Sequence, residues 1–492
     1  MNATPPPETS PSSTSVDVVV LNDAAAATAA TPQHDLTKER LATKRHVVKF
    51  VAFSLVGLFL FLAPIPTGED TFNIPLGVAV SWLEANVLQQ GGHDFAVFAL
   101  LAITTIAALG TLAVAALRPN LKEGSLVAKA FKTGPVYVIS RVAAALIAWS
   151  IFTGRGPEFI VSPFTGGVMQ AIVAHLIAIF VFFGVAIPIL TNFGIMEFFG
   201  ALVAKAVRKL FTLPGRSSVD LMASWFGSSV ASVILTRGQH EKGQYTGREA
   251  AVISTNFAFV SLPFSFVIAD TIGIQAHFVP WYLIICAVCI ILAVITPRMW
   301  PLRSLSDKFV DGSDKGQGDA QAEELIPQGI SSVRWGFWLA TDRARQASLK
   351  DVGRTGIRTY IDIYADLIPL ILAWGTLSLA IFEFTNIFQW ISTPMGWYLN
   401  LFGIADPMTY APATLIGFLD MFLPALLLGE AALNTQLILG ALAIVQIVYM
   451  TETGVTILKS KMPLNMWKLA AVFMIRTLLA IPLLAGLVWI FF

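Results

Sequence analysis

The sequence contains few charged residues and almost no cysteine for its length. Asp, Glu, Lys and Arg make up 13% of the 492 residues, whereas a soluble domain carries about 25%. Polar side chains are therefore too few to cover a soluble core. The two cysteines, Cys286 and Cys289, lie in one apolar segment, which is more typical of packed thiols than of a redox or metal pair.

Several functional motifs are also missing. The chain has no Walker A sequence, no G-x-G-x-x-G after a strand and no G-x-S-x-G, so we predict neither nucleotide hydrolysis nor catalytic residues. The net charge is +1, and no basic run with interleaved aromatics indicates nucleic-acid binding. His240 and Glu241 share one loop, but their spacing matches no metal motif, so we predict a solvated turn and no metal site.

What the sequence does contain is apolar residues in long segments. Hydrophobic residues make up 55% of the chain, and segments long enough to cross about 30 Å of hydrocarbon recur along it. Hydrocarbon offers no hydrogen-bond partners, so backbone groups must be satisfied within helices. We predict an all-α integral membrane protein with about nine transmembrane helices plus two re-entrant hairpins in an inverted-topology repeat.

Composition divides the chain into five predicted parts. The first is rich in Ala, Pro, Ser and Thr, which cannot bury enough surface to fold, and it lacks the apolar core of a signal peptide. The parts are a disordered cytoplasmic N-terminal tail (1–45), N-terminal transmembrane helices (46–165), a first repeat (166–296), a charged cytoplasmic connection (297–358) and a second repeat (359–492).

The distribution of basic residues predicts the orientation and the first hairpin. Lys44 and Arg45 precede the first span, so the positive-inside rule places the N-terminus in the cytoplasm. If the apolar segment 219–236 crossed the membrane fully, the basic residues that follow it would face outside. A re-entrant hairpin with Gly227 at its tip keeps them inside, and such breaks are tolerated inside protein. The alternative is an ordinary span with a Gly/Ser packing face.

The two repeats show the same order of segments. In each, a span is followed by an amphipathic stretch, an interrupted segment and two further spans, and Gly227 and Asp420 fall at nearly the same distance along their halves. The charge count gives the halves opposite starting sides. Inverted repeats with interrupted helices place transport sites near the membrane midplane, between the repeats.

Polar and ionisable groups at membrane depth are expensive, so they predict a substrate- or ion-binding site. Structural explanations stay open for several: serines can bond to their own helix, neighbouring polar residues can join helices, and acidic residues can mark segment ends. His175 is either a proton relay or a packing residue. Asp420 has only apolar neighbours, so it is either protonated or bound to a cation. The candidates are Thr191, Asn192, Glu197, Ser228, Ser229, Ser254, Thr255, Asn256, Asp420, Glu430, Thr451, Glu452 and Thr453.

Two stretches carry a family resemblance. TNFGIMEFFGALVAKAVRKLFTLPGRSSVDLMASWFGSSVASVILTRGQHEKGQYTGREAAVISTNFAFVSLPF (191–264) and FLFLAPIPT (59–67), with the later IPLGVAVSWL, resemble the YjiH family of bacterial membrane proteins. That family is grouped with the nucleoside-recognition, or Gate, domain, which recurs in concentrative nucleoside transporters, FeoB-type iron transporters and spore maturation proteins. The resemblance implies a Gate-type fold with re-entrant hairpins, so that both repeats are Gate-like. It does not name a substrate, because the first hairpin has GSSVAS where nucleoside transporters carry glutamate.

Together these features predict a secondary transporter in a bacterial cytoplasmic membrane. It would move a small polar solute, nucleoside-like or amino-acid- or peptide-like, by alternating access around a midplane site, coupled to H⁺ or Na⁺ and without a cofactor. The expected partners are the lipid bilayer, the solute and either a second copy or a partner membrane subunit. The alternatives are a FeoB-Gate-like ion or metal channel and a non-transporting membrane scaffold or sensor.

Overall fold

The computed structural model describes residues 44–68, 71–90, 93–117, 125–211, 213–227, 229–313, 330–458, 460 and 462–492. Nearly all of the predicted N-terminal tail therefore lies outside the described residues. Helices dominate, as predicted. The strands of the described part form two short antiparallel ribbons, β1 (Ile65–Gly68) with β2 (Thr71–Asn73) and β3 (Gln89–Gln90) with β4 (His93–Asp94).

The N-terminal third supplies helices that pack around the rest of the chain. They are α2 (Lys44–Leu62), α3 (Pro75–Leu83) with the π-helical turn η1 (Glu84–Leu88), α4 (Phe95–Leu117), α5 (Leu126–Phe131), α6 (Pro135–Thr153), α7 (Glu158–Val161) and the π-helical turn η2 (Pro163–Gly167). α4 packs on α6, and both α2 and α4 pack on the next long helix, α8.

The middle of the chain contains short helices between two long ones. In order they are α8 (Val168–Thr191), α9 (Ile195–Phe211), α10 (Ser217–Phe226), α11 (Ser229–Glu241), α12 (Gly247–Asn256), α13 (Leu262–Thr271), η3 (Gln275–His277), α14 (Phe278–Ile295), η4 (Thr296–Arg298) and η5 (Leu302–Ser304). α10 and α11 meet at Gly227, which was the expected tip of the first hairpin.

The last third follows a similar order. It comprises α16 (Ser332–Gln346), α17 (Leu349–Ile361), η6 (Asp362–Leu367), α18 (Ile368–Phe384), α19 (Ile387–Asn400), α20 (Pro407–Tyr410), α21 (Ala413–Ile416), α22 (Leu423–Leu427), α23 (Leu433–Val445), η7 (Met450–Gly454), α24 (Val455–Leu458) and α25 (Met466–Phe491). α16 and α17 show that residues 330–358 of the predicted connection are mainly helical, and they pack on α9 and α8 respectively.

Seven helical segments of the described part are long and apolar enough to cross a membrane. They are Lys44–Leu62, Phe95–Leu117, Pro135–Thr153, Glu158–Thr191, Gln275–Arg298, Leu349–Ile381 and Met466–Phe491. Three shorter apolar helices, Pro75–Leu88, Leu262–Thr271 and Leu433–Val445, accompany them. The short helices arise partly because two apolar segments, 249–271 and 434–452, are interrupted, after Asn256 and after Val445 respectively.

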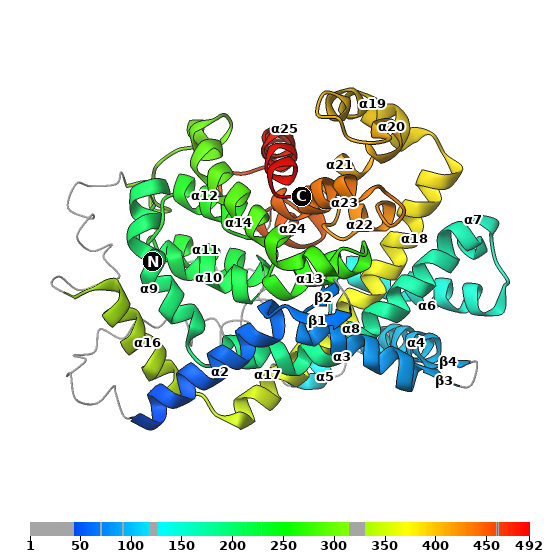
Figure 1. Ribbon diagram of the computed structural model, residues 1–492, viewed down its shortest axis with the longest axis horizontal. Coiled ribbons are helices and arrows are strands. Elements are labelled where there is room, and N and C mark those ends of the chain that lie inside the picture. The colour runs from blue at the N-terminus through cyan, green and yellow to red at the C-terminus, as the bar shows by residue number, and fades with distance from the viewer. Residues whose placement is uncertain are drawn as a thin grey trace, which may run out of the picture.

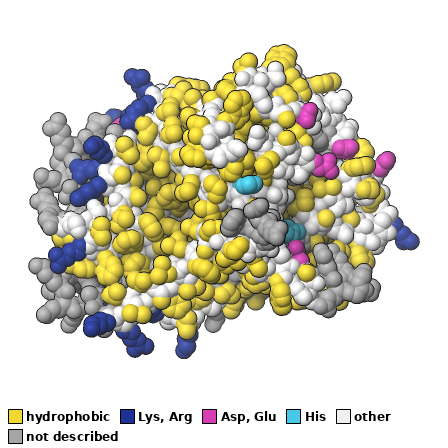
Figure 2. Space-filling view, in the orientation of Figure 1, with side chains coloured by type: hydrophobic (Ala, Val, Ile, Leu, Met, Phe, Trp, Pro, Cys, Tyr) yellow, Lys and Arg dark blue, Asp and Glu magenta, His cyan; other side chains and the backbone are white. Residues whose placement is uncertain are grey.

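The surface has the pattern of a membrane protein. Large apolar side chains are exposed on the long helices, for example Leu117, Trp390 and Trp467, which are 78%, 75% and 82% exposed. Figure 2 shows most of the visible Lys and Arg side chains at one end, where α9 and α16 lie, and acidic side chains toward the opposite end, with a largely hydrophobic face between them. Inside, segments far apart in sequence lie side by side: α25 packs on both α14 and α23 (Figure 1).

Candidate functional site

The first helix break separates α12 from α13. Thr246 and Glu249 cap the start of α12 reciprocally, and the helix ends at Asn256. α13 then starts afresh, because Ser261 accepts a hydrogen bond from the backbone of Phe264 and Pro263 occupies the first turn. The residues between the two helices therefore have non-helical backbone deep in the protein. α10 reaches this break, since the hydroxyl of Ser224 donates to the carbonyl of Phe259.

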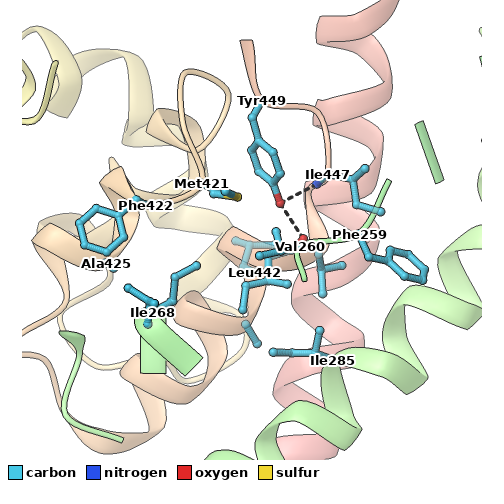
Figure 3. Packing of buried hydrophobic residues seen from close by; sticks show 14 of the residues in the cluster. Phe259, Val260, Ile268, Ile285, Met421, Phe422, Ala425, Leu442, Ile447 and Tyr449 are labelled. Carbon is cyan, nitrogen blue, oxygen red and sulfur yellow. Dashed lines mark hydrogen bonds between the residues drawn. The ribbon is translucent and has the colours of Figure 1, made fainter. Parts of the chain in front are cut away.

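The second break follows α23, and one tyrosine supports it. Ile447 has a φ of +64°, a conformation that is strained for a β-branched residue. The hydroxyl of Tyr449 accepts a hydrogen bond from the backbone N–H of Ile447 at 3.0 Å and lies 2.8 and 2.7 Å from the carbonyls of Ala443 and Ile444. Figure 3 shows this hydroxyl turned back toward the end of the helix. A side chain thus satisfies backbone groups that the break leaves without helical partners.

The second hairpin, formed by α20–α21 and α22, is attached to this break through Asp420. This carboxylate is buried; Oδ1 accepts a hydrogen bond from the backbone N–H of Phe422 at 2.8 Å and Oδ2 accepts one from the hydroxyl of Thr451 at 2.6 Å. The backbone N–H of Thr451 also donates to the carbonyl of Leu419 at 3.0 Å. Asp420 thus lies where the hairpin tip meets the break.

A buried arginine connects the two breaks. Arg476 lies within α25 and is fully buried. Its Nε and Nη2 donate to the carbonyl of Val445 at 3.1 and 2.7 Å, and its Nη1 donates to Oδ1 of Asn256 at 2.6 Å. The hydroxyl of Thr296 also donates to Oδ1 of Asn256. Because Asn256 and Val445 are the last residues of α12 and α23, one guanidinium joins the ends of both interrupted helices.

Gln446 adds an acceptor without a partner to this region. Its Nε2 donates to the carbonyl of Thr414 in the second hairpin at 2.7 Å and to the hydroxyl of Thr477 at 2.8 Å. Its Oε1 is buried and, among the residues that the structure describes, has no hydrogen-bond partner. A Cβ at Gly417 would overlap this oxygen, so a glycine is needed there. Such an acceptor calls for a water or ligand donor.

Four of the predicted site residues, Asn256, Asp420, Thr451 and Thr453, lie at the breaks. The hydroxyl of Thr453 donates to the carbonyl of Ile447 at 3.0 Å, so it also stabilises the strained turn. The side chain of Ser228 falls outside the described residues, and Glu452 lies in η7 with its side chain likewise outside them.

The other predicted residues near the breaks are buried against protein groups. Ser229 is buried at the start of α11. The hydroxyl of Ser254 faces the sulfur of Met462 at 3.4 Å, and the hydroxyl of Thr255 donates to the carbonyl of Ala251 at 2.7 Å. Their contacts are therefore with protein groups on neighbouring turns and segments.

Three predicted residues lie at the junction of α8 and α9, and a fourth lies at the surface. The hydroxyl of Thr191 donates to Ile187 in its own helix at 2.9 Å, and Nδ2 of Asn192 donates to the hydroxyl of Thr355 at 3.3 Å. Glu197 faces Arg343 of α16 at 3.5 Å, and burial raises the pKa of its carboxyl although the arginine opposes the rise. Glu430 is exposed after α22. The structure gives these four no contact with either break.

His175 lies between two carboxylates on a different part of the molecule. Its Nδ1 contacts Glu84 of η1 and its Nε2 contacts Asp270 at the end of α13. The histidine joins the N-terminal helices to the half of the interrupted helix that follows the first break. Its side chain is 32% exposed. His175 thus bridges two carboxylates on different elements, and its role as a proton relay or as a packing residue stays a prediction.

The residues that sequence reasoning missed are Arg476, Gln446, Thr296 and Thr477. For Arg476 a signal was present, because a cation eleven residues into the apolar segment 466–491 carries the same cost as the carboxylates that were selected. Gln446, Thr296 and Thr477 gave no comparable signal, since uncharged polar residues are common in membrane helices.

Comparisons with known proteins agree with this architecture. The family model described as Gate: Nucleoside recognition matches residues 173–275, which run from α8 through α10, α11 and the first break. An uncharacterized protein of Alkalihalophilus pseudofirmus is 36% identical over 462 residues, covering 93% of this chain and 97% of that protein. No solved structure matches.

Proposed function

This chain belongs to the family of multi-pass membrane proteins that contain the Gate nucleoside-recognition domain, and from that premise we propose that it is a secondary transporter for a small polar solute. The observation that carries the proposal is the connected polar network at the two helix breaks. An apolar bundle has no structural need for a buried carboxylate, an amide acceptor without a partner and a buried guanidinium in adjoining positions.

The order of elements supports an inverted repeat. α8, α9, the α10–α11 hairpin, interrupted α12–α13 and α14 correspond in order to α18, α19, the α20–α22 hairpin, interrupted α23–α24 and α25. Each hairpin touches the break of its own half, through Ser224 in the first and Asp420 in the second. We assign the repeats to residues 166–296 and 359–492, with 46–165 as supporting helices and 297–358 as the connection.

The hairpins also cross between halves. α11 of the first hairpin packs on η7 and α24 beyond the second break, and α22 of the second hairpin packs on α13 beyond the first. Phe264 and Phe422 make this second contact, with ring centroids 6.3 Å apart. A solute held at the breaks would therefore touch both repeats, which is the arrangement that alternating access requires.

Charge asymmetry supports an orientation in the cytoplasmic membrane. The end that carries α9 and α16 is rich in Lys and Arg (Figure 2), so we place it, and the N-terminus, on the cytoplasmic side. If the interrupted segments α12–α13 and α23–α24 cross as well as the seven long spans, and the two hairpins enter and return, this orientation keeps most basic residues inside.

We assign the binding role chiefly to Asp420, Thr451, Gln446 and Asn256. The solute would donate hydrogen bonds to Oε1 of Gln446 and to the carboxylate of Asp420, displacing the hydroxyl of Thr451. Because Asp420 attaches the second hairpin to the break, its exchange of partners would couple binding to movement of that hairpin. The chain shows no nucleotide-hydrolysis motif, so an ion gradient is the energy source that we propose.

Uptake into proteoliposomes tests this function. Purified protein should accumulate one class among labelled nucleosides, amino acids and small peptides, and uptake should collapse when ion gradients are dissipated. Asp420→Asn should abolish uptake at unchanged expression, whereas Glu430→Gln, which alters an exposed carboxylate, should retain it. Ion conductance without accumulation would support a channel instead. Uptake by Asp420→Asn at the wild-type rate would remove Asp420 from the mechanism.

A further inference from the structure

Arg476 is a cation in the interior of an apolar helix. It is the eleventh residue of the 26-residue helix α25, and it is fully buried. An ionised guanidinium at this depth is stable only if nearby groups replace its hydration. In the part of the chain that the structure describes, none of the ion pairs joins Arg476 to a carboxylate.

Its partners are instead neutral oxygens at the ends of two helices. The carbonyl of Val445 ends α23 and the side-chain oxygen of Asn256 ends α12. Helix C-termini carry partial negative charge, and transporters with interrupted helices bind their coupling cations at such ends with unwound carbonyls. Carbonyl and amide oxygens are also ligands that hard metal cations prefer.

The oxygens have little acceptor capacity left for a metal ion. The carbonyl of Val445 accepts two hydrogen bonds from the same guanidinium, at 3.1 and 2.7 Å, which uses both of its lone pairs. Oδ1 of Asn256 accepts one hydrogen bond from Arg476 and faces the hydroxyl of Thr296, whose single proton it shares with the carbonyl of Leu292. A metal ion beside the guanidinium would in addition meet a like charge at short distance.

We propose that the guanidinium of Arg476 is a fixed cation that takes the place of a dissociable sodium ion at the crossing of the two interrupted helices. The inference rests on the transport function proposed above, and it specifies the coupling: sodium does not bind at this crossing, and the positive charge that holds the helix ends together stays with the protein throughout the cycle. The driving ion is therefore one other than sodium, such as a proton bound at a carboxylate.

Thermal unfolding of the purified protein tests this inference without knowledge of the solute. The wild-type protein should have the same apparent Tm in sodium chloride and in choline chloride of equal concentration. Arg476→Ala should unfold at a lower temperature in choline chloride, and methylguanidinium chloride should restore part of the loss, because it can refill the vacated position. A ligand at about 100 times its Kd is expected to raise the apparent Tm of a chain of this length by about 2–3 °C.

A second variant covers the case in which Arg476→Ala does not fold. Arg476→Lys keeps the charge with fewer donors, so its apparent Tm should stay independent of sodium. A saturable rise in the wild-type or Arg476→Lys Tm with sodium over choline would overturn the proposal, and so would an Arg476→Ala protein that folds but gains nothing from methylguanidinium over choline. These outcomes do not depend on uptake, so a failure of the transport proposal is seen separately.

Discussion

Replacing Tyr449 with phenylalanine removes the hydroxyl that supports the second helix break and keeps the ring. The hydroxyl accepts from the N–H of Ile447 and lies within hydrogen-bonding distance of the carbonyls of Ala443 and Ile444. Tyr449 is fully buried, so no bulk water replaces these bonds. A buried group left without its partner costs about 1–3 kcal/mol, and two groups lose theirs. We therefore expect a local destabilisation of about 2–6 kcal/mol.

Hydrogen exchange measured by mass spectrometry reports this loss where it occurs. Because each 1.4 kcal/mol or so corresponds to a factor of ten, amides of residues 446–454 should exchange about 30 to 20,000 times faster in Tyr449→Phe if they exchange by local opening. Amides of α14 should change little. The strained φ of Ile447 adds to the effect, since the variant holds that conformation with fewer contacts.

A tyrosine elsewhere on the molecule is the matched control. The hydroxyl of Tyr398 in α19 donates to the carbonyl of Leu478 at 2.8 Å in an exposed position. Tyr398→Phe makes the same chemical change, and it should leave exchange at residues 446–454 unaltered. Unchanged exchange there in Tyr449→Phe as well would refute the reasoning that this hydroxyl holds the break.

Three further perturbations follow from contacts elsewhere in the protein. Arg141→Met removes a buried cation 2.7 Å from Asp366, which is 31% exposed. We expect the free energy of unfolding to fall by about 2–3 kcal/mol, seen as a lower apparent Tm. Adding Asp366→Leu should recover most of this loss. Burial raises the pKa of the Glu197 carboxyl, so ionisation of this group removes stability as pH rises through that pKa. The apparent Tm of the wild type should therefore fall above about pH 4 more steeply than that of Glu197→Gln. Parallel curves for the two proteins would contradict this. His175→Leu leaves two carboxylates without their shared cation, so its apparent Tm should drop and should partly recover with Asp270→Asn, whereas no recovery would exclude charge as the cause.

Sequence reasoning predicted the long apolar helices and the interruption at Gly227 because both depend on local composition. The segment 219–236 contains Gly and Ser at its centre, and α10 ends at Phe226 immediately before that point. The positions of the long helices agree with hydrophobicity because length and apolar composition decide whether a helix can span a membrane.

The two helix breaks could not be predicted in the same way. Residues 257–260 and 447–449 are apolar or aromatic, so the hydropathy of the segments continues through the interruptions. Pro263 was the local signal at the first break, because proline favours the first turn of a helix. At the second break a distant contact decides the backbone, since Tyr449 folds back onto the end of α23.

The candidate site was predicted in part for a related reason. Asp420 and Asn256 were identified from their cost in hydrocarbon, which is a property of each residue alone. The partners of Asn256 come from α14–η4 and α25, more than 35 residues away in the chain. Asn192 and Glu197 were selected on the same cost, but their partners lie in α16 and α17, whose packing on α9 and α8 only the structure shows.

Access to the second break from both sides of the membrane tests the central claim most directly. The chain has two cysteines, so a Cys286→Ser, Cys289→Ser background permits single-cysteine labelling. A thiol reagent that cannot cross membranes should label Thr451→Cys in right-side-out and in inside-out vesicles. Leu283→Cys, at a position 64% exposed on the apolar α14, should be labelled in neither. Labelling of Thr451→Cys from one side only, or from none, would contradict a site that opens alternately to both sides.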